Sequence, residues 1–144
     1  MKKYILLILF FVSIGCSNKP EPVSYGSDSC SNCKMLITDP KFGSEIVTTK
    51  GKIFKFDSIE CMAYFSTKLG DAAASFWVTD FSQPEDLMEA KNSFFLKSDK
   101  IKSPMGMNLA AFANKKELQT AAAEFNGSQL TWKEVVNYVK KQWN

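Results

Sequence analysis

Two stretches of the chain repeat one pattern of apolar and polar positions. In the first, β-branched and aromatic residues on both sides of a Lys-Gly pair predict two short strands and a tight turn over 45–56. Apolar positions then recur at helical spacing over 57–70, where Asp57 and Glu60 suit a capping box and a glycine closes the segment. A third strand is predicted over 74–81. The order is therefore strand, strand, helix, strand.

The second half of the chain repeats this order. The predicted elements are strands at 92–98 and 107–113, a helix at 114–127 and a strand at 128–132. Asn114 and Glu117 occupy capping-box positions in that helix, and Thr131 and Glu134 occupy them in a final helix. A further short helix is predicted over 82–91. The predicted fold class is α+β, with two tandem ββαβ units, an additional short helix and a C-terminal helix.

Each predicted unit is small for a separate domain. A unit of roughly 50 to 60 residues buries too little apolar surface to be stable without support. We therefore expect one folded region over 30–144, in which the first unit, about 30–90, and the second, about 91–144, pack together.

The beginning of the chain has the pattern of an export signal. Two lysines precede an apolar run over 5–14, which is shorter than the roughly 20 residues of a transmembrane helix and suits a signal peptide. Gly15 directly before Cys16 is typical of a lipoprotein signal peptide over 1–15, in which the Cys16 thiol becomes diacylglycerol-linked and the chain is cut before Cys16. Ser13 replaces the Leu or Val common in such signals, so a plain secretory signal and an uncleaved anchor remain alternatives.

Serine, proline and glycine dominate the next segment, 17–29, which predicts a flexible tether behind a lipidated Cys16. The tether and its lipid predict an extracytoplasmic domain that is anchored to a cell membrane. We expect it at the periplasmic face of the inner or the outer membrane.

Composition excludes several functions. The 144 residues contain no histidine and carry a formal net charge of +3, with lysines scattered among acids, so no basic stripe predicts nucleic-acid binding. The chain lacks a Gly-x-Ser-x-Gly motif and a phosphate-binding loop, which leaves hydrolases and kinases without support. Turns or helix caps account for the acidic residues Asp28, Asp39, Asp57 and Asp80. We expect no catalytic residues and no enzymatic activity.

The segment "SCSNCKML" carries the strongest chemical signal, because it holds the thiols of Cys30 and Cys33 and the thioether of Met35. Such soft ligands favour Cu(I), and the absence of histidine removes most sites for Cu(II). With Cys16 lipidated, the chain keeps three thiols, of which the third is Cys61. An odd number of thiols outside the cytoplasm needs a chemical explanation.

Three other interpretations of the Cys30 and Cys33 pair stay open. The two thiols could form a disulfide that staples the start of the domain. They could act in a thiol-disulfide oxidoreductase, although no predicted strand precedes Cys30 and no amphipathic helix begins at Cys33. A structural zinc site is the third interpretation, but it needs four nitrogen or sulfur ligands and the chain offers three thiols.

Other sulfur atoms lie farther along the chain. Met105 stands between Pro104 and Gly106, which predict a turn, so its thioether is a candidate ligand on a loop. Met107, at the head of an apolar strand, is expected in the core. Cys61 falls at the border of the apolar face of its helix and is expected mainly to pack, with metal binding as its weaker candidate role.

In this order, the motifs resemble the NosL family of copper-binding lipoproteins, which assist the assembly of nitrous oxide reductase. The resemblance extends from "CSNCKM" through "KFDSIECM" and "FWVTDF" to "MG" at 105–106. It implies a tandem ββαβ fold, one Cu(I) bound at Cys30, Cys33, Met35 and Met105, and a chaperone role in denitrification. The copper would pass to apo nitrous oxide reductase with the help of a membrane ABC-type assembly complex.

The sequence departs from the family in one segment. Many members carry His-Pro-Gly just after the first motif, where this chain has "TDPKFGSE". The copper ligands must therefore come from sulfur, backbone or water. The sequence leaves open which copper centre is supplied and whether a homodimer shares one ion.

Overall fold

The computed structural model describes residues 19–143. The predicted signal peptide over 1–15 and the predicted lipid site at Cys16 lie outside the described residues. None of the helices between residues 19 and 143 is long and apolar enough to cross a membrane.

The first unit contains a four-stranded antiparallel sheet and one α-helix. Its elements are β1 (Ser44–Thr48), β2 (Ile53–Phe56), α1 (Ile59–Leu69), η1 (Gly70–Ala72), β3 (Ala73–Thr79), β4 (Leu87–Glu89) and η2 (Ala90–Asn92), where η marks a short 3-10 helix. The strand order is β2-β1-β3-β4. Fully buried Ile46 of β1 pairs with Phe54 on one side and Phe76 on the other, so β1 lies inside the sheet.

The second unit contains a three-stranded antiparallel sheet and two α-helices. Its elements are β5 (Phe94–Lys97), β6 (Leu109–Phe112), α2 (Lys115–Phe125), β7 (Ser128–Leu130) and α3 (Trp132–Trp143). The strand order is β6-β5-β7. In both units the first strand lies between the second and the third, and an α-helix lies between the second and the third strand in the sequence. The predicted tandem ββαβ fold is therefore confirmed.

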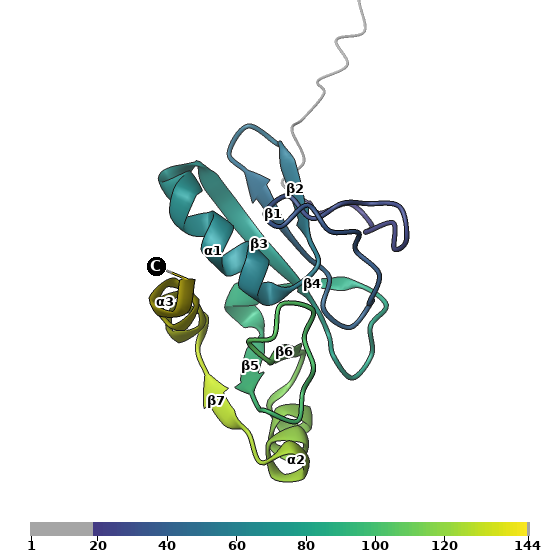
Figure 1. Cartoon of the computed structure of the whole chain (residues 1–144), viewed down its shortest axis with the longest axis vertical. Coiled ribbons are helices and arrows are strands. Elements are labelled where there is room, and N and C mark those ends of the chain that lie inside the picture. The colour runs from purple at the N-terminus through teal and green to yellow at the C-terminus, as the bar shows by residue number, and fades with distance from the viewer. Residues whose placement is uncertain (1–18, 144) are drawn as a thin grey trace, which may run out of the picture.

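The two units share one core, and α3 of the second unit lies beside α1 of the first (Figure 1). Trp132, at the start of α3, stacks on Phe76 of β3 and Phe95 of β5, with ring centroids 5.2 and 5.6 Å away. At the other end of α3, the rings of Tyr64 and Trp143 are 5.3 Å apart. The main core consists of the buried side chains Cys30, Ile37, Ile46, Phe56, Ile59, Cys61, Met62, Ala63, Val78, Ala90, Phe95, Met107, Leu109, Ala111, Val135 and Val139.

The prediction of a helix over 82–91 is wrong. Three residues of this segment form β4 and pair with β3 at Trp77, Val78 and Thr79, and the 3-10 turn η2 begins only after them. Hydrogen bonding to the edge of a sheet is a tertiary contact that the local pattern does not contain.

The start of α1 also differs from the prediction. Ser58, not Asp57, is the N-cap, and its Oγ accepts the Cys61 N–H at 3.3 Å. Glu60 does not close a capping box, because its buried carboxylate accepts a hydrogen bond from Ser103 instead. Asp57 therefore precedes the cap, and its side chain is available for other contacts.

Residues 20–29, which we call the N-terminal strap, contact the first sheet instead of forming a free tether. The anchors on the sheet are Glu45 of β1 and Lys55 of β2, which are paired in register. The contacts are Glu21 N–H to Glu45 Oε2 at 3.0 Å, Lys55 Nζ to the Pro22 carbonyl at 2.8 Å and Lys55 Nζ to Asp28 Oδ2 at 2.8 Å. The structure thus differs from the flexible tether expected over 17–29, since Glu21, Pro22 and Asp28 are held to the folded body.

The buried carboxyl group of Glu45 should make the stability of the fold depend on pH. Burial raises the pKa of Glu45 from its ordinary value of 4.5 to about 7. The folded protein therefore keeps a proton that the unfolded chain releases, so the contribution of Glu45 to stability is full below pH 4.5 and is lost as the pH rises through about 7. We expect Glu45→Gln to raise the free energy of unfolding by up to about 3 kcal/mol near pH 8 and to change it little near pH 4.

Urea unfolding of the reduced, metal-free protein at both pH values measures this effect. An equal change at the two pH values would show that Glu45 is not the titrating group.

Candidate metal site

Backbone hydrogen bonds close the loop at residues 30–35, which we call the cysteine loop. The bonds run from Cys30 N to Met35 O at 2.8 Å, from Lys34 N to Cys30 O at 3.0 Å and from Ser31 N to Lys55 O at 2.8 Å. Lys34 has a φ of 68°, which lets the chain turn back within the loop. The bond to Lys55 fixes the loop on β2, beside the start of α1.

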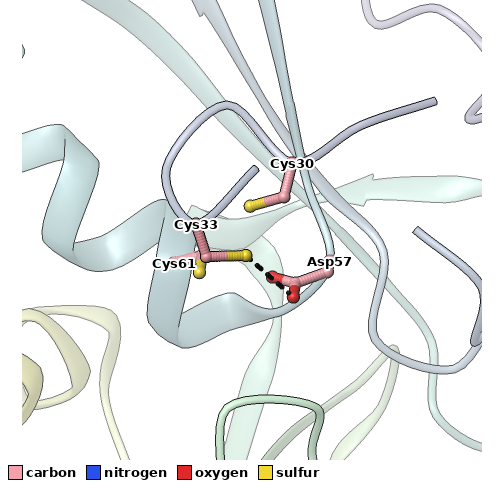
Figure 2. A group of neighbouring side chains, drawn as sticks. All are labelled: Cys30, Cys33, Asp57 and Cys61. Carbon is pink, nitrogen blue, oxygen red and sulfur yellow. Dashed lines mark hydrogen bonds between the residues drawn. The ribbon is translucent and has the colours of Figure 1, made fainter. Parts of the chain in front are cut away.

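Three thiols and one carboxylate meet where the cysteine loop faces the first turn of α1. The sulfur atoms of Cys30, Cys33 and Cys61 and a carboxylate oxygen of Asp57 all lie within 4.8 Å of one another. Figure 2 shows the four side chains gathered around one small space, two from the cysteine loop, Asp57 from the turn after β2 and Cys61 from α1. We call these four residues the thiol cluster.

The members of the thiol cluster differ in their exposure. Cys30 and Cys61 are fully buried, Asp57 is 2% exposed and Cys33 is half-buried. In the part of the chain that the structure describes, all three cysteines are free thiols. An ion or a partner's ligand would therefore reach the cluster from the side of Cys33.

Hydrogen bonds hold Asp57 and Cys61 in their orientations. Asp57 Oδ2 accepts from the Cys33 thiol at 3.3 Å, and its Oδ1 accepts from Ser58 Oγ at 3.2 Å. The side-chain amide of Asn32 donates to Cys61 Sγ at 3.5 Å. The carboxylate is thus aimed at the thiols by the same serine that caps α1.

One of the three thiols ionises much more readily than the others. A hydrogen bond from Cys61 lowers the pKa of Cys30 to about 6 in spite of burial, and backbone N–H groups of the loop add to this effect. The same hydrogen bond, together with burial, raises the pKa of Cys61. Burial raises the pKa of Cys33 to about 11, and its contacts with Cys30 and Asp57 add to the shift. Near neutral pH the metal-free cluster therefore carries one thiolate and two protonated thiols.

The two candidate thioethers lie in different surroundings. Met35 is 47% exposed at the end of the cysteine loop. Met105 is partly buried and packs against the main core, which includes Cys30 and Cys61. Met107 is 7% exposed and belongs to the core, as predicted. The structure thus gathers three thiols into one cluster and leaves Met35 about half exposed to solvent.

The sequence predicts that Asp57 caps a helix and that Cys61 mainly packs in the core, with metal binding as its weaker candidate role. The structure puts both beside Cys30 and Cys33. The available signal was their spacing: residues four apart at a helix start can face the same side, and here that side meets the cysteine loop.

With Asp57, the thiol cluster offers four donor atoms, three sulfur and one oxygen. Zinc binds carboxylates as well as thiolates and prefers four ligands. The sequence argued against zinc because the chain offers only three thiols. In the structure Asp57 supplies a fourth donor atom, so this argument no longer applies. The donor set alone suits both Cu(I) and zinc.

A family model described as NosL matches residues 23–139, which is most of the chain. The chain belongs to the NosL family. The resemblance noted in the sequence is thereby confirmed. The relatives of this NosL-family chain include the copper-binding lipoprotein NosL of Stutzerimonas stutzeri, which is 29% identical over 150 residues, covering 91% of this chain and 77% of that protein.

A solved structure shares the NosL fold. The crystal structure of the copper chaperone NosL from Shewanella denitrificans matches with a TM-score of 0.67 and 20% sequence identity, covering 82% of this chain and 96% of that one. The two proteins therefore have the same arrangement of elements.

Proposed function

We propose that this NosL-family protein binds one Cu(I) ion in the thiol cluster and acts as a copper chaperone, not as an enzyme. The observation that carries the proposal is the convergence of three thiols from two segments of a chain without histidine. Thiolates are soft ligands that favour Cu(I). The names of two relatives, a copper-binding lipoprotein and a copper chaperone, support the same cargo.

The spacing of the sulfur atoms suits a single ion between them. Two thiolates that bind one ion at about 2.3 Å, the zinc–sulfur bond length, are at most about 4.6 Å apart. The donor atoms of the cluster lie within 4.8 Å of one another, so small side-chain rotations bring them into range. Cys30, Cys33 and Cys61 are the proposed thiolate ligands, and Met35 and Met105 are proposed as additional thioethers.

Uneven burial of the ligands suits transfer of the metal. Cys30 and Cys61 are fully buried, whereas Cys33 is half-buried and Met35 is about half exposed. A partner's ligand can replace the accessible sulfurs first, while the buried thiolates still hold the ion. We name apo nitrous oxide reductase as the recipient, assisted by a membrane ABC-type complex in denitrification, because the sequence resembles family members with that role.

The proposal includes an extracytoplasmic location and a lipid anchor on Cys16. Its support is the signal-like pattern over 1–15 and the lipoprotein relative. An anchored carrier stays at the membrane surface without spanning it.

A thiol-disulfide oxidoreductase is the weaker candidate. The lowered pKa of Cys30 fits a reactive thiol. However, Cys30 is fully buried, and the accessible partner Cys33 has a raised pKa. Attack on a substrate disulfide needs an exposed thiolate.

The reduced protein from Ser17 onward should bind about one Cu(I) ion per chain, because the cluster has room for one ion among its sulfurs. Titration against a coloured Cu(I) chelator measures the stoichiometry and the affinity. X-ray absorption at the copper edge should show a shell of sulfur only, whereas a zinc-loaded sample should show one oxygen beside the sulfurs if Asp57 binds zinc.

The Cys30→Ser, Cys33→Ser double variant is the variant that tests the site, because it removes two proposed thiolate ligands and nearly keeps the size of both side chains. Full Cu(I) affinity in this variant, or a copper shell rich in nitrogen or oxygen, would overturn the proposed function.

A further inference from the structure

A buried carboxylate joins α1 to the loop that carries Met105. Glu60 lies in the first turn of α1, next to Cys61, and is fully buried. Its Oε1 accepts a hydrogen bond from Ser103 Oγ, in the loop between β5 and β6. This loop reaches from the second unit to the end of α1 that carries the thiol cluster (Figure 1).

Ser103 is also the base of the turn that contains Met105. The Gly106 N–H donates to the Ser103 carbonyl at 3.1 Å, and the Asn108 N–H donates to Ser103 Oγ at 2.8 Å. Gly106 has a φ of 75° and Asn108 a φ of 61°, so the chain bends sharply on both sides of Met107. The Ser103 hydroxyl accepts one hydrogen bond from the loop and donates one to Glu60, which sets the place of the turn on α1.

Stability alone does not account for a carboxylate at this position. Glu60 Oε2 has no hydrogen-bond partner among residues 19–143, and no ion pair involves Glu60 within that range. A buried carboxyl group without full pairing destabilises a fold, and an apolar side chain would fill the same space without that penalty.

We propose that Glu60 is a positioning residue, which holds the Met105 turn on the first turn of α1 so that the Met105 thioether can reach copper in the thiol cluster. The inference rests on the proposed function for its copper-bound part. Met105 is partly buried and packs against the main core, of which Cys30 and Cys61 are members. Glu60 acts through Ser103 and does not itself bind the metal.

A double-mutant cycle on Cu(I) affinity tests this role. Glu60→Leu should lower the affinity by about tenfold, the lower end of the range for residues that support metal ligands, and Met105→Leu, which removes the thioether itself, should lower it by at least as much. The double variant should lose no more than Met105→Leu alone, because Glu60 acts through Met105. Glu60→Gln keeps an oxygen acceptor for Ser103 and should restore most of the affinity.

Ser103→Ala provides a second break of the same link and should reproduce Glu60→Leu. Losses that multiply in the double variant, or an unchanged affinity in both Glu60→Leu and Ser103→Ala, would overturn the proposal. A residue that only supports the fold would lower the unfolding temperature without this dependence on Met105.

Hydrogen exchange in the metal-free protein separates the inference from the copper assignment. The amides of Gly106 and Asn108 should exchange faster in Glu60→Leu than in the native protein. The Gly51 amide, which bonds the Thr48 carbonyl at 2.9 Å in the turn between β1 and β2, is the matched control and should not change. Unchanged exchange at Gly106 and Asn108 would refute the anchor even if copper binds. Faster exchange in a protein that binds no Cu(I) would support the anchor and refute the proposed function.

Discussion

Replacement of Cys61 by serine should lower the Cu(I) affinity of the reduced protein more than about 100-fold. The Cys61 sulfur lies within 4.8 Å of the other donors of the thiol cluster, and its full burial prevents solvent from taking its place. Changes to residues that only support metal ligands already lower affinity about 10- to 100-fold, so loss of a thiolate ligand should have a larger effect. Competition with a Cu(I) chelator measures the change.

Met62→Leu is the matched control for this prediction. Met62 is the next residue of α1 and is fully buried, and the exchange conserves volume, with an expected destabilisation below about 1.5 kcal/mol. It should leave the Cu(I) affinity unchanged. Native affinity in Cys61→Ser would return Cys61 to the packing role that the sequence favoured.

The Cu(I) affinity should rise about 100-fold per pH unit between about pH 7 and pH 9, once the chelator's own pH dependence is removed. In this range Cys30 is already a thiolate, since its pKa is lowered to about 6. Cys33, with a pKa raised to about 11, and Cys61, with a raised pKa, still hold their protons. Binding by all three sulfurs therefore releases two protons, and each released proton gives about a tenfold rise per unit.

The same titration in Cys61→Ser should show a rise of only about tenfold per pH unit, because one thiol proton is gone and the serine hydroxyl can still donate a hydrogen bond to the Cys30 thiolate. A tenfold rise in the native protein would mean that Cys61 keeps its proton and does not bind. An affinity that does not change with pH would contradict the pattern of thiol pKa values in the metal-free cluster.

Most of the fold could be predicted because its signals lie within a few neighbouring residues. Asn114 accepts the Glu117 N–H at 2.9 Å, and the Glu134 N–H donates to Thr131 Oγ1 at 3.3 Å, so both helices start as their polar residues predicted. β4 escaped prediction because its three residues become a strand only by pairing with β3. The N-cap of α1 is one residue later than predicted, because Ser58 and Asp57 are both suitable N-cap residues and Ser58 takes the position.

The candidate site could be predicted only in part, for a similar reason. Cys30 and Cys33 are close in sequence, so their spacing alone suggested a pair. Asp57 and Cys61 join them only because a hydrogen bond from Ser31 to Lys55 seats the cysteine loop beside α1. No local pattern contains that contact. Metal binding by Met35 and Met105 stays a prediction.

The N-terminal strap determines how far the folded body could move from a lipid on Cys16. Glu21 is the first residue of the strap with a bond to Glu45, and an extended chain from Cys16 to that point spans at most about 18 Å. A free chain from Cys16 to Cys30 would reach about 50 Å. A lipid on Cys16 would therefore keep the folded body within that short distance of its anchor, close to the headgroups of one membrane. Copper exchange would then take place at the membrane surface, which favours partners that are themselves attached to that membrane over proteins that diffuse freely.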